Sequence, residues 1–361
     1  MTEEKIKNVL SGINEPVLNR DFVKLGFVKE ISLNGKNLKL ILGISDRNEK
    51  ITEELIKKIK AEFHRSIPEI SNVEVNFVTG VTEQINEKKS SVLPGVKNTV
   101  AVASGKGGVG KSTVAVNLAV ALAKTGAKVG LIDADIYGPS IPLMFGVKEK
   151  PKVMQVGDKN KLVPIEKFGV KIMSIGFLME ESTAVVWRGP MASSALKQFM
   201  SDVVWGELDY LLFDMPPGTG DIQLTLSQTI PLTGAVIVTT PQEISLADAR
   251  KGYIMFQKVN VPTIGIVENM SYYLNPDGSR EYIFGKGGGE KMCEEFKVKL
   301  LGEIPINTNI RKGGDDGKPV VTGEAVPEEA EIFLHIAGEL IKEINLLNVN
   351  ASDSSELVIE I

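Results

Sequence analysis

Apolar residues in the first 80 positions follow a helical period in two places and a strand period in three. Helical spacing over 3–10 and again over 51–63 predicts two amphipathic helices. Alternation over 28–33, 38–42 and 73–78 predicts three strands, and the Asn-Gly dipeptide between the first two runs is typical of a hairpin. The pattern therefore predicts a small α-β-β-α-β unit.

Beyond residue 98 the pattern changes to short, continuous apolar runs separated by helical stretches. A strand that is buried on both faces has no polar side, so such runs are typical of a parallel sheet covered by helices. The sequence therefore predicts an α/β domain with a doubly wound, mostly parallel sheet. Its expected strands cover residues 100–103, 129–132, 170–175, 210–213, 235–238, 264–267 and 300–304.

The two patterns divide the chain into four parts. We expect a small α+β domain over 1–80, a polar linker over 81–97, the α/β domain over 98–346 and an acidic tail over 347–361. With 361 residues, of which 43% are hydrophobic, the chain is long enough to build a core in each domain.

Charge and cysteine content restrict the classes of function. A net charge of -5 gives no basic excess for binding nucleic acid or an anionic membrane, so we expect proteins or small molecules as partners. No apolar run approaches about 18 residues and the N-terminus is acidic, which predicts a soluble cytoplasmic protein. The single cysteine, Cys293, excludes an intrachain disulfide and a multi-cysteine metal site within one chain.

A glycine-rich loop follows the first strand of the α/β domain, and a helical stretch follows the loop. Its spacing, G-x-x-x-x-G-K-[ST], is that of a phosphate loop, in which backbone N–H groups surround the phosphates of a nucleotide. Lys111 is then expected to reach the β- and γ-phosphates, and the Ser112 hydroxyl to bind Mg²⁺. The alternative is a glycine-rich turn that binds nothing. The loop residues are Gly105, Lys106, Gly107, Gly108, Val109, Gly110, Lys111, Ser112 and Thr113.

Three aspartates follow expected strands, at the sheet edge where nucleotide sites lie in such folds. Asp133 and Asp135 follow the run over 129–132, and their alternation directs one toward the Mg²⁺ shell and the other toward an attacking water. Asp214 follows the run over 210–213, which is the Walker B arrangement for holding Mg²⁺ through water. Each aspartate alone is equally compatible with a helix cap or a turn.

Two further strand ends are expected to flank the base of the nucleotide. Asn269 follows the run over 264–267 and offers an amide that can both donate to and accept from the adenine edge. The segment 305–307 follows the last run. The alternative for Asn269 is an asparagine in a turn.

The loop also resembles a known family, because Lys106 follows its first glycine. It is similar to the deviant phosphate loop of the MinD/ParA-like ATPases, in which this extra lysine reaches across a dimer to the partner's nucleotide. The alternative for Lys106 is a solvated loop lysine. Nearly the whole chain is similar to the Mrp/ApbC family of iron-sulfur cluster carrier ATPases. The segments that carry this resemblance are 133–142, 187–191, 214–221, 268–271 and 284–289.

The resemblance implies an ATP-hydrolysing homodimer with ATP and Mg²⁺ as cofactors. It implies that Lys106, Lys111 and Asp135 are catalytic and that Asp133 and Asp214, with Ser112, support Mg²⁺. The N-terminal unit resembles the small domain that bacterial members share with other cluster-assembly factors. The implied partners are a second copy, cluster-assembly proteins and apo-acceptor proteins.

One departure from the family pattern concerns the cargo. The family usually carries Cys-x-x-Cys between the positions of Ser271 and Phe284, and this chain has no cysteine there. We therefore expect that the chain alone holds no stable four-iron cluster, since two copies of Cys293 supply too few thiolates. Whether an iron-sulfur cluster is bound in another way stays open. The alternatives are a MinD/ParA-like, partner-regulated ATPase switch without metal cargo, and a small-molecule ligase or kinase on the same scaffold.

Overall fold

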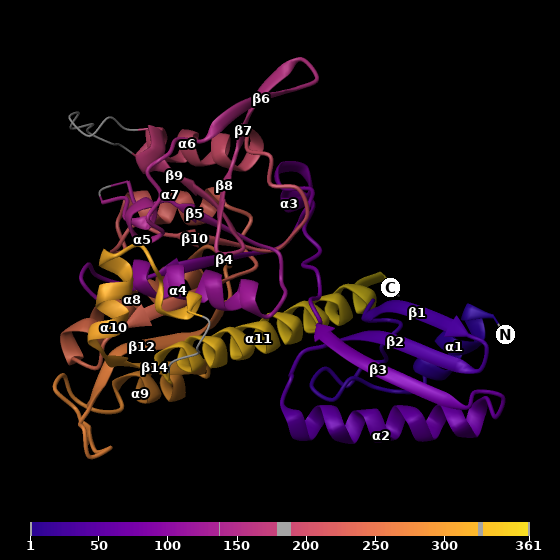
Figure 1. Ribbon diagram of the computed structural model, residues 1–361. Coiled ribbons are helices and arrows are strands. Elements are labelled where there is room, and N and C mark those ends of the chain that lie inside the picture. The colour runs from indigo at the N-terminus through magenta and orange to yellow at the C-terminus, as the bar shows by residue number, and fades with distance from the viewer. Residues whose placement is uncertain (1, 137, 179–188, 324–327, 360–361) are drawn as a thin grey trace. The chain divides into compact units, whose positions relative to one another are not determined.

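The computed structural model of the protein describes residues 2–136, 138–178, 189–323 and 328–359 (Figure 1). Three residues of the segments used for the family resemblance (137, 187 and 188), and the last two residues of the expected acidic tail, lie outside these ranges. The chain forms two compact units, one made of residues 1–85 and 341–361 and the other of residues 86–340.

The smaller unit has the predicted element order. A three-stranded sheet has the strand order β1-β2-β3, with β1 antiparallel and β3 parallel to β2. Leu38, Leu40 and Leu42 alternate along β2 and are buried against Ile59 and Phe63, because strand and helix each present one apolar face to a shared core. The elements are α1 (Glu3–Leu10), β1 (Val28–Asn34), β2 (Asn37–Ile44), α2 (Glu49–Ser66) and β3 (Asn72–Thr79).

The C-terminal helix α11 (Glu328–Ile359) completes this unit with its second half. The buried Asn345 amide donates to Ser45 Oγ at 3.0 Å and to the Gly80 carbonyl at 2.8 Å. Leu346 and Val349 pack against the apolar core of the unit. The residues expected to form an acidic tail therefore continue α11 up to Ile359, and Val349 among them packs against the small core.

The larger unit is built on a mostly parallel sheet, as predicted. Among the described residues this sheet has nine strands. Its parallel strands lie in the order β14-β12-β11-β4-β10-β5-β9, and the short β13 (Arg280–Glu281) and β8 (Ile165–Lys167) are antiparallel to β12 and β9. The parallel strands are β4 (Val96–Ala103), β5 (Val129–Asp133), β9 (Val170–Ser174), β10 (Leu208–Asp214), β11 (Gly234–Thr239), β12 (Thr263–Leu274) and β14 (Lys299–Ile306).

Helices connect and cover these strands. Helix α4 is buried continuously from Val114 to Leu122, so it is apolar on all sides and packs against β4, β5 and β10. This packing fixes the first turn of α4 beside the ends of the central strands. The helices are α4 (Lys111–Lys124), α5 (Ile141–Met144), α6 (Gly189–Ser201), α7 (Asp221–Thr229), α8 (Glu243–Lys258), α9 (Gly288–Phe296) and α10 (Thr308–Asp315), with 3₁₀ turns over Ile175–Leu178 and Val320–Thr322.

The larger unit also contains elements that were not predicted, among them a short helix and a hairpin. Helix α3 (Glu87–Val92) lies within the expected linker, where the buried Lys89 donates from Nζ to the Lys97 carbonyl at 2.6 Å. A separate antiparallel hairpin is formed by β6 (Lys152–Val156) and β7 (Lys159–Val163). It carries no apolar run because almost all of its residues are exposed or half-exposed.

Candidate functional site

The phosphate loop connects β4 to α4 and depends on its glycines in two ways. Gly108 and Gly110 have φ angles of 82° and 81°, a left-handed conformation that glycine adopts without strain. A Cβ atom on Gly105 would lie 2.2 Å from the Asp248 backbone, and one on Gly110 would lie 2.2 Å from the Asn269 amide nitrogen. A Cβ on Gly107 or Gly108 would meet nothing within 4 Å. The backbone at Gly107 and Gly108 is therefore accessible from the site, while Gly105 and Gly110 pack tightly against Asp248 and Asn269.

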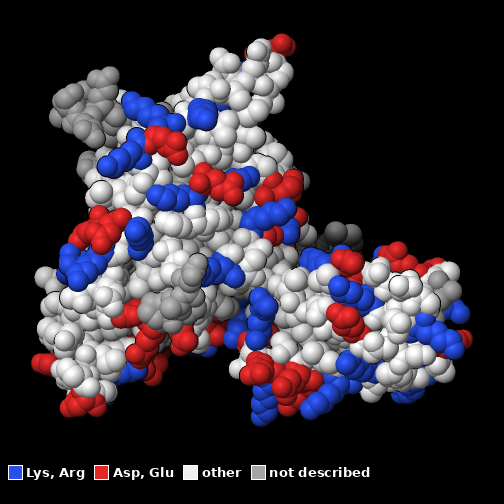
Figure 2. Space-filling view, in the orientation of Figure 1, with Lys and Arg blue, Asp and Glu red and all other residues white. Residues whose placement is uncertain are grey.

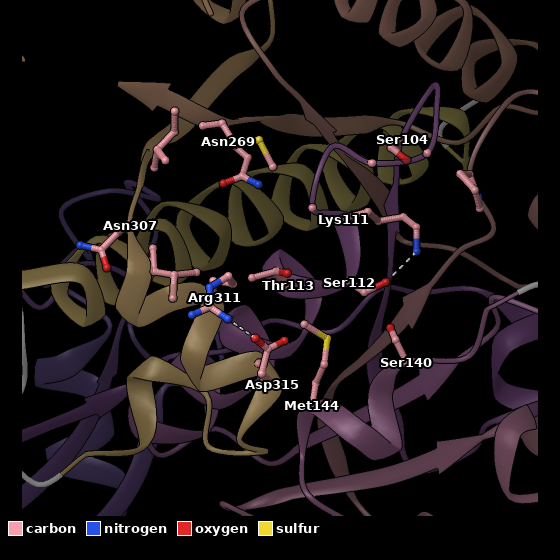
Figure 3. A pocket seen from close by; sticks show the side chains of 18 of the residues that line it. Ser104, Lys111, Ser112, Thr113, Ser140, Met144, Asn269, Asn307, Arg311 and Asp315 are labelled. Carbon is pink, nitrogen blue, oxygen red and sulfur yellow. Dashed lines mark hydrogen bonds and ion pairs between the residues drawn. The ribbon is translucent and has the colours of Figure 1, made fainter. Parts of the chain in front are cut away.

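The first turn of α4 holds the two side chains on which nucleotide chemistry depends. Lys111 Nζ lies 2.6 Å from Asp214 Oδ1 and 3.4 Å from Asp135 Oδ2, and the Ser112 hydroxyl donates to Asp214 Oδ2 at 2.6 Å. Figure 3 shows Lys111 and Ser112 side by side, with 3.2 Å between Nζ and Oγ. The Lys111 side chain is only 6% exposed, so its charge is balanced by these two carboxylates rather than by water.

Asp133 and Asp214 lie next to each other at the ends of the paired strands β5 and β10. Both side chains are fully buried. Burial, together with the nearby charge of Asp214, raises the pKa of the Asp133 carboxyl to about 8, although hydrogen bonds from Ser174 and the Ile141 amide oppose the rise. Burial also raises the pKa of Asp214, against the lowering effect of Lys111 and Ser112.

The alternation of Asp133 and Asp135 separates the two carboxylates. Asp133 is 0% exposed and Asp135 is 8% exposed, and Asp135 lines the pocket in front of the phosphate loop. Asp133 instead accepts the Ser174 hydroxyl at 2.8 Å and the Asp135 amide at 3.2 Å. Asp135 therefore has access to the pocket, and Asp133 lies one layer behind it.

Lys106 also lines this pocket. Its side chain is half-exposed, and its carbonyl accepts the Ser104 hydroxyl at 2.9 Å. Within the described part of the chain its ammonium has no acidic partner at salt-bridge distance, unlike that of Lys111. Lys106 therefore stands at the edge of the loop without an acidic partner from the described residues.

The pocket has a volume of about 880 Å³, enough for a nucleotide. In Figure 3 Lys111 and Ser112 lie on one side of the pocket and Asn307 on the other, with Arg311 and Thr113 between them. Arg311 donates to Asp315 one turn further along α10. The sequence placed the segment 305–307 beside the base, but it gave no signal for Arg311 or Asp315, because no motif marks α10.

Asn269 lies on β12 between the phosphate loop and the rest of the pocket. Its amide nitrogen donates to the Val109 carbonyl at 2.8 Å. The next residue, Met270, has a φ of 56°, an unusual value for a residue other than glycine, and the pairing of β12 with β14 is irregular after Asn269. Asn269 therefore holds the loop in place, while its contact with adenine stays a prediction.

Comparisons with known proteins agree with this geometry. The family model described as the NUBPL iron-transfer P-loop NTPase matches residues 95–341. The chain belongs to this family. A second model, described as an iron-sulfur cluster assembly protein, matches residues 3–77. The family resemblance predicted from the loop and strand-end motifs is therefore confirmed.

Curated relatives of this NTPase family match along almost the whole chain. The iron-sulfur cluster carrier protein of Synechocystis sp. is 42% identical over 353 residues, covering 96% of this chain and 99% of the relative. That of Escherichia coli K12 is 43% identical over 340 residues, covering 94% and 91%. Both units of this chain are thus included in the similarity.

Solved structures share the fold of the larger unit. A nucleotide-binding protein from Archaeoglobus fulgidus in complex with ADP is 42% identical, with a TM-score of 0.57, and covers 65% of this chain and 93% of its own. The cell division ATPase MinD of Pyrococcus furiosus, 24% identical with a TM-score of 0.50, covers 67% and 97% and shows the fold alone. The predicted P-loop NTPase fold is therefore confirmed.

In this NTPase, the segment between Ser271 and Phe284, where the family usually carries Cys-x-x-Cys, forms a hairpin of β12 and β13. Its turn is closed by the Asn275 amide donating to the Ser279 carbonyl at 2.9 Å and by the Asp277 carboxylate accepting the Ser279 hydroxyl at 2.6 Å. The Arg280 guanidinium lies 4.1 Å from the centre of the Tyr272 ring. The hairpin is therefore stabilised by its own polar and aromatic side chains.

Cys293 lies on α9 with its side chain buried. Burial raises the pKa of its thiol to about 12, and the carboxylates of Glu268 and Glu290 contribute to the rise.

Among the described residues no cluster of three or more His, Cys, Asp or Glu side chains could hold a metal ion. An Mg²⁺ site needs fewer protein ligands, since substrate phosphates and water complete it. No helix in the described part of the chain has both the length and the apolar character needed to cross a membrane.

Proposed function

We propose that this chain is a homodimeric ATPase that acts in iron-sulfur cluster assembly or delivery, and that it does not hold a stable four-iron cluster by itself. The observation that carries the proposal is the contact of Lys111 and Ser112 with Asp214 at the start of α4, 2.6 Å in each case. A buried lysine, a hydroxyl and a carboxylate next to an open glycine loop are the groups that phosphoryl transfer needs.

The residues at this site fit Mg²⁺. The Ser112 hydroxyl and the Asp214 carboxylate are oxygen donors that already lie within hydrogen-bonding distance of each other, and Mg²⁺ prefers such ligands. Asp133, buried beside Asp214, supports the same position from behind. Bound Mg²⁺ would neutralise charge on the β- and γ-phosphates.

Lys111 would exchange partners when a nucleotide binds. Its ammonium is held by Asp214 and Asp135, and the phosphates offer competing negative charge. Transfer of Lys111 to the phosphates would release Asp135, the carboxylate that lines the pocket, to orient the attacking water and accept its proton. Lys106 would then serve the nucleotide of a second copy, since its own subunit gives it no acidic partner among the described residues.

The expectation that the chain holds no stable four-iron cluster by itself depends on the number of cysteine thiolates that two copies can supply. A four-iron cluster takes four thiolates, and two copies of this chain offer two cysteines, each buried with a raised thiol pKa. We therefore propose that thiolates from partner proteins complete any cluster handled by this chain. The buried Cys293 also favours a second candidate, a partner-regulated ATPase switch without metal cargo.

Steady-state ATP hydrolysis of three variants tests the catalytic assignment. Lys111→Ala should lower the rate at least about 100-fold, because it removes a cation from the transition state. Asp135→Ala should retain nucleotide binding but lose turnover by a similar factor. Lys258→Ala, at the exposed end of α8, is the matched control and should keep the wild-type rate. An Asp135→Ala protein with the wild-type rate would remove Asp135 from the mechanism.

A further inference from the structure

The β6–β7 hairpin extends from the body of the larger unit (Figure 1). Strand β7 is fixed to the body on one side, where the Leu162 amide donates to the Asp202 carbonyl at 2.8 Å and the Val204 amide donates to the Leu162 carbonyl at 2.9 Å. In the described structure β6 pairs only with β7. The outer backbone edge of β6 is therefore available for another strand.

One face of this hairpin combines lysines with apolar side chains. Successive cross-strand pairs on this face each join one lysine to one apolar residue, and we call it the lysine–apolar face. Met154 is 42% and Val156 is 44% exposed, so their apolar groups are accessible. Figure 2 views the hairpin from a side that is mostly uncharged apart from an acidic residue at the tip, so this view does not display the lysines of the lysine–apolar face. The pairs are Lys152 with Val163, Met154 with Lys161, and Val156 with Lys159.

The charge of the hairpin differs from that of the whole protein. Residues 148–163 contain five lysines and two acidic residues, a net charge of +3, whereas the whole chain has a net charge of -5. Lysines on an edge strand oppose pairing with a second basic edge of the same kind. They do not oppose pairing with an acidic strand, so the charge selects the kind of partner.

The lysine–apolar face borders a cleft of about 340 Å³ between the hairpin and the body of the larger unit. Val156 and Lys161 contribute to the cleft from the hairpin, and Met200, Val203 and Trp205 contribute from the body. Lys161 is held there by a hydrogen bond of 3.0 Å to the Ser201 carbonyl. Exposed apolar groups on the hairpin are therefore continuous with an apolar recess.

We propose that the β6–β7 hairpin binds an acidic, extended segment of a partner protein, which adds as a strand beside β6. Side chains of a strand alternate between its two faces. In a segment of alternating acidic and apolar residues, the acidic side chains therefore lie on one face of the strand and the apolar side chains on the other. The backbone edge of β6 provides affinity, and the lysine–apolar face with its cleft provides specificity. A membrane surface fits less well, because residues 152–163 include no aromatic side chain to anchor the hairpin at an interface.

Fluorescence anisotropy with a labelled peptide tests this proposal. The probe is a peptide of roughly ten residues in which Glu and Val alternate, titrated with the full-length protein. Two control peptides replace either every Glu by Lys, or two of the valines by proline to remove backbone donors. The Glu-Val peptide should bind, each control should bind at least about tenfold more weakly, and added salt should weaken binding.

The double variant Lys152→Glu with Lys159→Glu should weaken peptide binding at least about tenfold, while its circular dichroism and ATP hydrolysis stay unchanged. The matched control, Lys57→Glu with Lys60→Glu on the exposed face of α2, changes the net charge equally and should bind as the wild type does. Absence of binding, equal binding of the proline peptide, or equal binding by the double variant would overturn the proposal. A membrane role would also overturn the proposal. In that case the wild-type protein would sediment with phosphatidylserine vesicles, the double variant would not, and the Glu-Val peptide would not bind.

Discussion

The thiol of Cys293 has the surroundings of a structural cysteine rather than those of a ligand. It is buried on α9, and the negative charges of Glu268 and Glu290 add to the effect of burial on its pKa. Metal binding requires the thiolate, so a raised thiol pKa weakens the affinity for iron. The neighbouring carboxylates therefore disfavour the thiolate form of Cys293, the only cysteine of the chain, and so its use as a cluster ligand.

The rate of alkylation by iodoacetamide as a function of pH tests this environment. Because the thiol pKa is about 12, the thiolate fraction stays small up to high pH. The rate should rise about tenfold per pH unit between about pH 7 and pH 10 without levelling off. In urea the same thiol should level off near pH 8.5, its ordinary pKa. A folded protein whose rate levels off at or below about pH 8.5 would contradict the assignment.

At the scale of elements, α11 is the helix whose role the sequence did not indicate. Its buried Asn345 donates to the Gly80 carbonyl at 2.8 Å and accepts the Thr82 amide at 2.9 Å. Both of these hydrogen bonds would be lost if the Asn345 amide were removed. The polar contacts of one residue thus help to fix the C-terminal helix to the small sheet unit.

The substitution Asn345→Ala should lower the free energy of unfolding of the smaller unit by about 1–3 kcal/mol, since it removes the hydrogen bond to the buried Gly80 carbonyl and the one from the Thr82 amide. Urea denaturation followed by circular dichroism measures the change. Asn8→Ala, an exposed position on α1 of the same unit, is the control and should change stability by less than about 0.5 kcal/mol. Equal stability of the two variants would show that the Asn345 contacts contribute little.

The elements that the sequence predicted are those whose side chains repeat with a regular period or a fixed motif. The parallel strands were visible because they are buried on both faces, and the phosphate loop because glycine and lysine must stand at set spacings. The contact of Asn269 with the Val109 carbonyl was not predictable, because it joins residues far apart in the sequence. The β6–β7 hairpin and α3 lack an apolar pattern, so no periodicity marked them.

At the scale of the whole molecule, the proposed role of Lys106 requires a site shared between two copies. Lys106 and Lys111 stand in the same loop, yet only Lys111 has acidic partners among the described residues. If Lys106 serves the other copy, each site contains Lys111 from one copy and Lys106 from its partner. Two variants that each lack one of these lysines then have complementary defects.

Mixing Lys106→Ala with Lys111→Ala should restore ATP hydrolysis. In a mixed dimer one site has both lysines and the other has neither, so an equal mixture should reach about one quarter of the wild-type specific activity. Each variant alone should be nearly inactive. Specific activity of the wild type should also fall on dilution into the monomer range. A mixture no more active than the average of its components would contradict the shared site.

Anaerobic reconstitution of the purified protein with iron and sulfide tests most directly whether the chain is an ATPase that holds no stable four-iron cluster by itself. After desalting, iron is counted per dimer and absorbance is recorded in the sulfur-to-iron charge-transfer region, with ATP hydrolysis measured on the same sample. We predict an active ATPase with no stable four-iron cluster, because two copies of the chain would supply two buried cysteines and a four-iron cluster takes four thiolates. A stable, stoichiometric cluster that disappears in Cys293→Ser would contradict the account and make Cys293 an intersubunit ligand.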